Sequence, residues 1–372
     1  MADYQIRHTE DIISPALIYY RELFTHNLEE IIRLAGGAER LWPHAKTHKC
    51  AQMVKLQISR GVKRFKCATV AELEMVCAAG AEAAILAMAP AGPTPKRLIA
   101  LQKAYPQVRI LGIADCEYHL RAYGQAALSA GVEVELLLDV NMGMDRTGVP
   151  TEKAAALYRR AAKMPGVRIC GFHCYDGNRH EADMAERQGC VDRDSAPVFA
   201  VREELQQEGY SVELMVMGGS ASLSCHTRFA GEGVYYSPGT ILLQDDAYAE
   251  NFPELRMIPA AAILCRVISH PCEGTFTLDL GYKGIAGDPP ATNRGVIVGL
   301  EHCRAVMQNE EHWVFRMDKG FEEQIPPVGS VLYVIPRHVC PCAMLYPSIL
   351  IAEGGEIVDE WEVTARNRKI TF

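Results

Sequence analysis

Apolar and polar positions along the chain form two patterns, the first of which occupies residues 41–236. Short apolar runs alternate there with segments whose apolar positions recur at the helical period. Continuous apolar runs, without alternation, are typical of parallel strands that are covered on both faces. Between the sixth and seventh runs, two helical pieces are predicted, at 181–190 and 195–208. Eight strands are predicted, at 41–46, 64–68, 84–88, 108–114, 132–140, 167–175, 212–217 and 233–236. Eight such units over about 200 residues predict a (β/α)8 barrel of the TIM type.

The second pattern begins near residue 249 and is typical of β-structure alone. Short strand-like segments, among them 258–268 and 330–335, are separated by glycine, proline and charged turns. An early apolar run at 15–20 is predicted to join the same sheet. We therefore expect an α/β protein with a barrel at 21–248 and an all-β domain made of 1–20 and 249–372.

Length, charge and cysteine content narrow the class of protein. The 372 residues are 49% apolar, enough for a large core in more than one domain. The net charge of −8 is spread without a basic stripe, which argues against nucleic acid as a partner. No run reaches the roughly 18 apolar residues of a membrane span, and the N-terminal residues are polar, unlike a signal peptide. Thirteen scattered cysteines indicate reduced thiols, so a cytoplasmic protein is expected.

One stretch at the end of the first predicted strand carries candidate chemistry. Residues 42–49 read Trp-Pro-His-Ala-Lys-Thr-His-Lys, which places Lys46 where a strand turns toward a helix. This edge of an α/β barrel carries the active site. A lysine there is either a surface cation or a desolvated amine that forms a Schiff base with a carbonyl compound. The residues by themselves leave both interpretations open.

The same stretch resembles the cofactor-lysine motif, Pro-His-x-Lys-Thr-His-Lys, of the D-threonine aldolase and D-serine dehydratase family. Members are fold-type III pyridoxal-phosphate enzymes related to alanine racemase, and the resemblance extends over nearly the whole chain. It implies that Lys46 is the catalytic residue that carries pyridoxal 5'-phosphate. It also implies a divalent metal, a small-molecule D-amino acid substrate, and either a homodimer or a monomer.

Two glycine-rich turns follow the last two predicted strands. They read Gly-Gly-Ser-Ala-Ser at 218–222 and Ser-Pro-Gly-Thr at 237–240. Glycine lets the backbone N–H groups approach an anion, and the hydroxyls of Ser220 and Ser222 add donors. One such turn is a common loop, but two turns after strands seven and eight predict a phosphate site. The resemblance implies that the cofactor phosphate binds at Gly218, Gly219, Ser220, Gly239 and Thr240.

Two other strand ends are candidates for contacts with the cofactor ring. Arg146 lies in Gly-Met-Asp-Arg-Thr-Gly, which resembles the family pattern Gly-x-x-Arg-x-Gly, whose arginine lies against the pyridoxal ring. From the residues alone, Arg146 is equally a loop cation. His173 and Tyr175 alternate to the same side of the sixth strand, where a tyrosine is able to bond the pyridine nitrogen or the phosphate. Aldolases of the family often have glutamine in place of His173, so the partner of the ring nitrogen stays open. The alternative for His173 is a buried histidine bonded to backbone.

A candidate metal site follows a strong predicted strand of the second domain. Residues 336–342 read Pro-Arg-His-Val-Cys-Pro-Cys, and a strand-like segment would project His338 and Cys340 to the same side. Imidazole with thiolate suits zinc best, and magnesium and manganese are alternatives. A half-buried pair beside a proline turn is the other interpretation. In the family, a His-x-Cys or His-x-Asp pair holds the catalytic ion, and the cysteine form is typical of dehydratases. Cys342 is an additional candidate ligand, and Lys283 is a second candidate for amine chemistry.

Together, these features predict a pyridoxal-phosphate- and metal-dependent lyase that acts on a β-hydroxy-D-amino acid. Dehydration with deamination and retro-aldol cleavage both fit, and the cysteine slightly favours dehydration. An amino-acid racemase would need the lysine and the cofactor but no metal. A non-catalytic pyridoxal-phosphate carrier resembles the barrel alone, and the second domain with His338 and Cys340 argues against it.

Overall fold

The computed structural model describes residues 2–371, which divide into two compact units. The first, which we call the barrel unit, contains Ile31–Lys46, Ala51–Gly239 and the segment from Arg368 on. The second, the β unit, contains the chain up to Glu30 together with Thr47–Cys50 and Thr240–Asn367.

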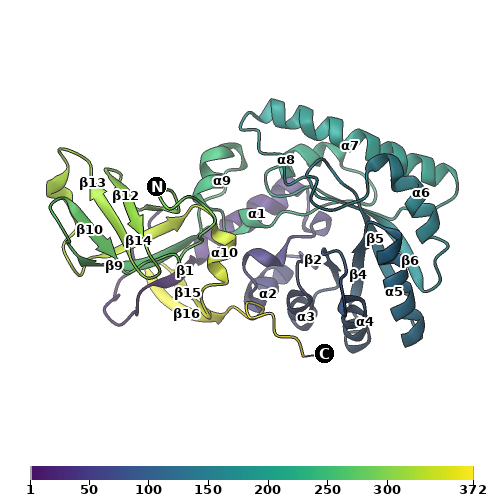
Figure 1. Ribbon diagram of the computed structural model, residues 1–372, viewed down its shortest axis with the longest axis horizontal. Helices are drawn as coiled ribbons and strands as arrows, with labels where there is room; N and C mark the ends of the chain where they lie inside the picture. The colour runs from purple at the N-terminus through teal and green to yellow at the C-terminus, as the bar shows by residue number, and fades with distance from the viewer. Residues whose placement is uncertain (1, 372) are drawn as a thin grey trace. The chain divides into compact units, whose positions relative to one another are not determined.

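Seven parallel strands form the sheet of the barrel unit, and each pairs with its neighbours in chain order (Figure 1). Most of their residues are buried, as expected for strands that are covered on both faces. The strands are β2 Arg64–Cys67, β3 Ala83–Leu86, β4 Arg109–Ala114, β5 Val134–Asp139, β6 Val167–Cys174, β7 Leu214–Met217 and β8 Val234–Tyr236.

An irregular segment fills the eighth position of the barrel, where the first strand was predicted. The N–H of Trp42 donates to the carbonyl of Tyr236 in β8 (2.8 Å), and the N–H of Lys66 in β2 donates to the carbonyl of Pro43 (2.9 Å). This segment therefore bridges both edges of the sheet. The strand assignment was wrong because Pro43 has no N–H for a ladder and the 3-10 helix η2, Ala45–Thr47, follows it at once. The predicted barrel class is confirmed with this modification.

Helices connect the strands and cover the outside of the sheet (Figure 1). They are α2 Ala51–Ser59, α3 Val70–Ala78, α4 Thr94–Ala104, α5 Glu117–Ala130, α6 Thr151–Ala161, α7 Met184–Gln207 and the short α8 Leu223–His226. The two helical pieces predicted before β7 are one continuous helix, with Pro197 inside it. A proline within a helix costs about 3 kcal/mol. Buried side chains on both sides of it, such as Val191 and Val198, offset that cost by packing.

The interior of the barrel is a packed apolar core. Side chains at alternate strand positions point inward, as the pleat requires. The core residues are Trp42, Ala83, Ile85, Leu111, Ile113, Leu137, Cys170, Leu214 and Val216. Because side chains fill the interior, ligands are confined to the ends of the strands.

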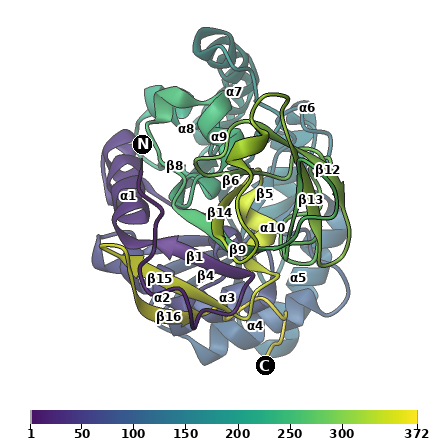
Figure 2. The same ribbon diagram turned by 90° about the vertical axis from the view of Figure 1, so that its left-hand side faces the viewer.

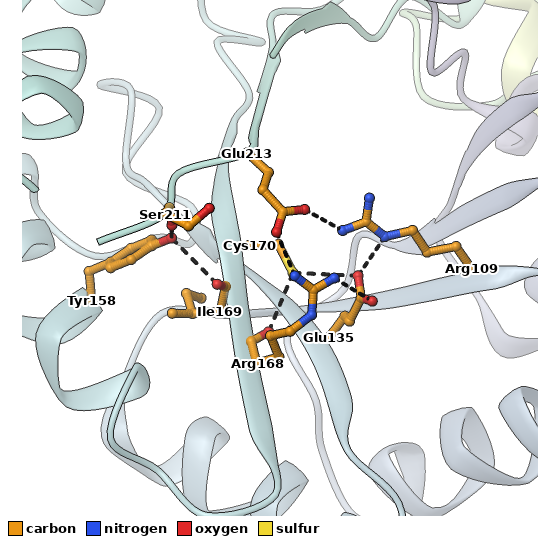
Figure 3. Close-up of polar contacts among 8 residues, drawn as sticks. All are labelled: Arg109, Glu135, Tyr158, Arg168, Ile169, Cys170, Ser211 and Glu213. Atoms are coloured by element: carbon orange, nitrogen blue, oxygen red, sulfur yellow. Dashed lines mark hydrogen bonds and ion pairs between the residues drawn. The ribbon is translucent and has the colours of Figure 1, made fainter. Parts of the chain in front are cut away.

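Charged side chains form a network across the amino-terminal ends of β4, β5, β6 and β7 (Figure 3). Arg109 pairs with Glu135 (2.6 Å) and Glu213 (2.9 Å), and Arg168 pairs with the same two carboxylates (2.6 and 2.5 Å). In barrels this end serves stability, while the opposite end carries chemistry. The network therefore belongs to the scaffold.

The β unit is built on a nine-stranded sheet in the order β12-β13-β10-β9-β1-β15-β16, with β14 paired to both β9 and β11. Figure 2 shows β1, Ala16–Tyr20, beside β15, and the early run thus joins this sheet as predicted. The remaining strands are β9 Ala261–Ser269, β10 Thr275–Leu278, β11 Gly295–Ile297, β12 Cys303–Gln308, β13 Trp313–Met317, β14 Val331–Pro336, β15 Ser348–Glu353 and β16 Glu356–Glu362.

Helices are few in the β unit. Two short helices are α9 Asp246–Asn251 and α10 Val339–Ala343. A longer helix, α1 Arg21–Ala35, follows β1 directly in the chain. No helix between residues 2 and 371 has the length and apolar character that a membrane crossing requires. All thirteen cysteines are free thiols, in agreement with the sequence prediction.

Candidate active site

A cavity of about 310 Å³ lies at the carboxyl ends of the barrel strands. Its volume is at the lower end of the range for small-molecule sites, roughly 300–1,000 Å³. Four residues predicted for the site line it, namely Lys46, Arg146, His173 and Tyr175. Apolar side chains such as Met88 complete the lining. The cavity therefore brings together the predicted lysine and ring-contact residues.

Lys46 is half-buried in η2 and lines the cavity beside His44. The backbone N–H of Lys46 donates to Nδ1 of His44 at 3.4 Å. Burial, and then the charges of Lys66 and Lys46, hold the pKa of His44 well below its usual value, so this imidazole is neutral. Lys283, the second candidate for amine chemistry, is 61% exposed. A cavity position suits a cofactor-bearing amine, and an exposed one does not.

A second lysine, which the sequence analysis missed, is buried at the same end of the barrel. Lys66 is only 2% exposed, and its Nζ lies 5.2 Å from the centroid of the Tyr175 ring. Burial, and then the charge of Lys46, lowers the pKa of Lys66 to about 7. Its place next to the last residue of β2 was the signal that could have identified it. Lys66 adds a positive group to the surroundings of the cavity.

Arg146 and Tyr175 are in contact. The guanidinium carbon lies 4.9 Å from the ring centroid, within the range of a cation–π interaction. The loop that carries Arg146 requires Gly148, because its φ is 104° and a Cβ there would lie 2.4 Å from the backbone nitrogen of Asn141. Arg146 and Lys66 thus both approach the ring of Tyr175.

His173 forms a buried pair with Asp139. Its Nδ1 lies 2.7 Å from Oδ1 of Asp139, and the two residues are 5% and 4% exposed. Burial lowers the pKa of His173 more than Asp139 raises it, so the imidazole is neutral. Burial would raise the pKa of Asp139, but the hydrogen bond from His173 and other polar neighbours lower it, so the carboxylate is charged. The alternative of a histidine bonded to backbone is therefore wrong.

Asp139 was not among the residues predicted for the site. A signal was present, since Asp139 ends β5 and pairs in register with His173 on the adjacent strand β6. Carboxyl ends of neighbouring parallel strands meet at one edge of the sheet, so a polar pair at this point is expected.

The first glycine turn is held by a buried polar network. Gly218 has φ 72°, and a Cβ there would lie 2.4 Å from Cδ2 of His226, so only glycine fits. Ser222 Oγ accepts from the N–H of Gly219 (3.0 Å) and donates to Asp176 (2.7 Å), whose other oxygen bonds His226 (2.7 Å). Ser222 was expected as a phosphate donor, but its hydroxyl hydrogen is already used.

Ser220 joins the two glycine turns. Its Oγ accepts from the N–H of Gly239 at 3.0 Å, which leaves the hydroxyl hydrogen to donate elsewhere. Thr240, the other residue predicted for the phosphate, has its Oγ1 3.4 Å from Sγ of Cys340, and both residues belong to the β unit. Among residues 2–371, the two turns are not part of the lining of the 310 Å³ cavity. The first turn is close to it, because a Cβ on Gly219 would lie 3.0 Å from the ring of Tyr175, which lines the cavity.

His338 and Cys340 lie together in the β unit, but on a different element from the one predicted. His338 precedes the helix α10 and Cys340 lies in its first turn, so the strand-like geometry was wrong. The two side chains are hydrogen-bonded to each other. Asp288, which the sequence did not reveal, lies 2.6 Å from Nδ1 of His338.

The environment of this pair favours the thiolate form of the cysteine. Burial by itself would raise the pKa of Cys340. The net effect is a lower pKa, because His338 contributes a hydrogen bond and a positive charge, and the hydroxyls of Thr240 and Thr47 also bond the sulfur. Burial also opposes charge on His338, yet Cys340 and Asp288 raise its pKa to about 9. A thiolate, an imidazole that gives up one proton to the ion's place, and a carboxylate behind the imidazole form a donor set that fits zinc.

Cys342 is directed to backbone groups. It is buried, its Sγ accepts from the N–H of Ala286 (3.3 Å), and it donates to the carbonyl of His338 (3.3 Å). These bonds explain why it does not extend the pair to a third ligand.

The described residues contain one cluster of three metal-type donors, and it lies elsewhere. Asp115, Cys116 and His119 of the barrel unit place their donor atoms within 4.8 Å of one another at the start of α5. His119 pairs with Asp115 at 2.7 Å, and Asp115 also accepts from the N–H of Gly148. These contacts anchor the loop of Arg146 to the start of α5.

Comparison with known proteins identifies the family. The alanine racemase N-terminal domain family matches residues 21–245, more than half of the chain. The chain belongs to this family. Its second part, residues 260–352, matches the serine dehydratase domain family. The predicted recognition, a fold-type III pyridoxal-phosphate enzyme of the D-threonine aldolase and D-serine dehydratase group, is confirmed.

Relatives of this alanine racemase-family chain include two aldolases. It is 28% identical to a D-threonine aldolase of an Arthrobacter species, over 95% of this chain and 92% of the relative. It is 24% identical to a 3-hydroxy-D-aspartate aldolase of Paracoccus denitrificans, over 96% and 93% of the two chains. The crystal structure of the D-threonine aldolase from Filomicrobium marinum superposes with a TM-score of 0.88 at 26% identity, over 99% and 100% of the two chains.

Proposed function

We propose that this chain is a pyridoxal-phosphate- and divalent-metal-dependent lyase that acts on a β-hydroxy-D-amino acid. One observation carries the proposal. A cavity at the carboxyl ends of the barrel strands is lined by Lys46, Arg146, His173 and Tyr175, in a chain similar over nearly its whole length to a D-threonine aldolase. The proposed substrate is a small molecule. A cytoplasmic location and a homodimer stay predictions from the sequence.

The residues of the barrel unit fit the cofactor. Lys46 would carry it, the turns with Gly218, Gly219, Ser220 and Gly239 would hold its phosphate, and Arg146 and Tyr175 would lie beside its ring. Two observations support this fit. The hydroxyl hydrogen of Ser220 is left to donate, and Nε2 of His173 is buried without a hydrogen-bond partner among residues 2–371. Bound pyridoxal phosphate supplies an electron sink for the charge left at the substrate Cα.

His338 and Cys340 would hold the divalent ion, with zinc as the first choice and magnesium or manganese as alternatives. The lowered pKa of Cys340 and the carboxylate of Asp288 behind His338 support this assignment. A divalent ion supplies a Lewis acid for the hydroxyl oxygen of a substrate. Thr47 and Thr240, which contact Sγ of Cys340 at 3.3 and 3.4 Å, would keep the thiolate oriented.

Retro-aldol cleavage is the reaction that we propose first. In it, a base takes the proton of the β-hydroxyl, the Cα–Cβ bond breaks with its electron pair left at Cα, and glycine and an aldehyde result. The support is the named activity of the two aldolases to which the chain is similar.

Dehydration is the second candidate, and Cys340 favours it, since the cysteine form of the metal pair is typical of the dehydratases that the chain resembles. In this reaction the amine of Lys46 takes the α-proton and hydroxide leaves Cβ. The enamine that results is then hydrolysed by water to a keto acid and ammonia.

Product analysis distinguishes the two reactions. We would incubate the purified protein, loaded with pyridoxal phosphate, with D-threonine and zinc or manganese. Glycine and acetaldehyde would establish cleavage, and 2-oxobutyrate with ammonia would establish dehydration. An epimer of threonine would instead indicate a racemase. If the protein consumes neither D-threonine, D-serine nor 3-hydroxy-D-aspartate, the proposed function is wrong.

A further inference from the structure

His173 uses one ring nitrogen and leaves the other without a partner. Nδ1 is bonded to Asp139, whereas the buried Nε2 has no hydrogen-bond partner among residues 2–371. The residue is 5% exposed and lines the cavity with Lys46. A buried polar atom without a partner costs about 1–3 kcal/mol, so an atom of this kind beside a ligand cavity points to a bond that the ligand completes.

We propose that His173, oriented by Asp139, is the hydrogen-bond partner of the pyridine nitrogen of bound pyridoxal phosphate. This inference rests on the cofactor of the proposed function and not on which reaction follows.

The tautomer of His173 decides which cofactor atom it is able to bind. Asp139 is charged and accepts the proton of Nδ1, so Nε2 of the neutral ring presents a lone pair and acts only as an acceptor. The phosphate and phenolate oxygens of the cofactor are also acceptors, and a lone pair repels them. A protonated pyridine nitrogen is the ring atom that donates. The match of donor and acceptor therefore selects the pyridine nitrogen.

The charge of Asp139 favours the same arrangement. Its carboxylate behind the imidazole stabilises, through the ring, the proton that the pyridine nitrogen donates to Nε2. A protonated pyridine nitrogen is the better electron sink, which links this pair to the chemistry at Cα.

Tyr175 is the competing partner, since it projects from the same side of the strand. Its ring, however, is approached by Arg146 at 4.9 Å and by Lys66 at 5.2 Å. Both contacts use the π face of the ring. These contacts hold the ring of Tyr175 in place and do not involve its hydroxyl, so the Tyr175→Phe variant below tests this alternative.

Nitrogen-15 NMR tests the inference directly. We would load the wild type and His173→Phe, His173→Gln and Tyr175→Phe variants with pyridoxal phosphate labelled at the ring nitrogen. His173→Phe keeps an aromatic ring but has no acceptor, so its signal is expected to move toward that of an unprotonated pyridine. His173→Gln still offers an acceptor and is expected to restore part of the wild-type shift. Loss of this bond should also weaken cofactor binding roughly tenfold.

Three outcomes separate the possibilities. An unchanged nitrogen signal in His173→Phe at full cofactor occupancy would overturn the inference. A signal that moves only in Tyr175→Phe would overturn it in favour of tyrosine. If the wild type takes up no pyridoxal phosphate, the proposed function itself fails. Should His173→Phe not fold, Asp139→Asn keeps the test valid, because it removes the charge that fixes the tautomer and should move the signal in the same direction.

Discussion

Nδ1 of His338 lies 2.6 Å from Oδ2 of Asp288, fifty residues earlier in the chain. A histidine that binds a metal through one nitrogen commonly donates its other N–H to a carboxylate, which fixes the ring and raises its basicity. Because Nδ1 is used by Asp288, Nε2 is the nitrogen that bonds Cys340, and an ion would take the place of the proton between them. Asp288 therefore belongs to the proposed metal site as an orienting residue.

Asp288→Asn is expected to weaken metal binding. Loss of such a carboxylate typically costs about 10–100-fold in affinity. The measurement is a zinc titration against a chromogenic chelator, with the metal content of the dialysed protein as a second readout. Asp318→Asn is the matched control, because Asp318 is a partly exposed carboxylate of the same unit that pairs with Arg304. Equal zinc affinity of Asp288→Asn and wild type would remove Asp288 from the site.

Lys46→Ala is expected to abolish the absorbance of lysine-linked pyridoxal phosphate, because Lys46 is the amine that lines the cavity. Absorbance spectra after reconstitution and dialysis provide the measurement. Lys283→Ala is the matched control, since that side chain is exposed and paired with Glu311 (3.4 Å). If the absorbance persists in Lys46→Ala and disappears in Lys283→Ala, the roles of the two lysines are reversed.

Gly218→Ala is expected to weaken cofactor binding as well as stability. Its Cβ would lie 2.4 Å from Cδ2 of His226, so the turn has to move. Gly131→Ala is the control, since it has a similar φ of 68° with no atom within 4 Å of the added Cβ. The left-handed backbone alone costs an alanine about 1 kcal/mol. Both variants should therefore unfold more easily, but only Gly218→Ala should show a higher Kd for pyridoxal phosphate in a fluorescence titration.

Glu135→Gln is expected to destabilise the protein at neutral pH and much less in acid. Burial would raise the pKa of Glu135, but Arg168 and Arg109 lower it below its unfolded value of about 4.3. A carboxylate with a lowered pKa contributes stability that is present above the unfolded pKa and is lost as the pH falls through the folded pKa. We expect a difference of about 1 kcal/mol at pH 7.

Urea unfolding at several pH values checks this prediction. The difference between wild type and Glu135→Gln should shrink as the pH falls below about 4. Glu82→Gln is the control, because Glu82 is 59% exposed in its pair with Lys63 and such surface pairs contribute little. A difference that is independent of pH would mean that the glutamine disturbs packing and not the ion pairs.

Local patterns were sufficient to predict most of the fold. Apolar runs and helical periods located all seven strands of the parallel sheet and the change to β-structure after the barrel. The errors have local causes. Pro43 prevents a regular strand before Lys46, and packing around Pro197 keeps α7 continuous. In both places the hydrophobic pattern was read correctly, but backbone chemistry or tertiary packing determined the element.

Runs of neighbouring residues were enough to recognise the family, the motif around Lys46 and the two glycine turns. Which distant side chains meet depended on the fold in three dimensions. Asp139 and His173 are 34 residues apart, and Asp176 and His226 are 50 apart, yet each pair is in hydrogen-bond contact. The burial of Lys66, which lowers its pKa, likewise depends on the closed barrel around it. The physical reason is that hydrogen-bond geometry and desolvation depend on distances in space, which one-dimensional spacing does not specify.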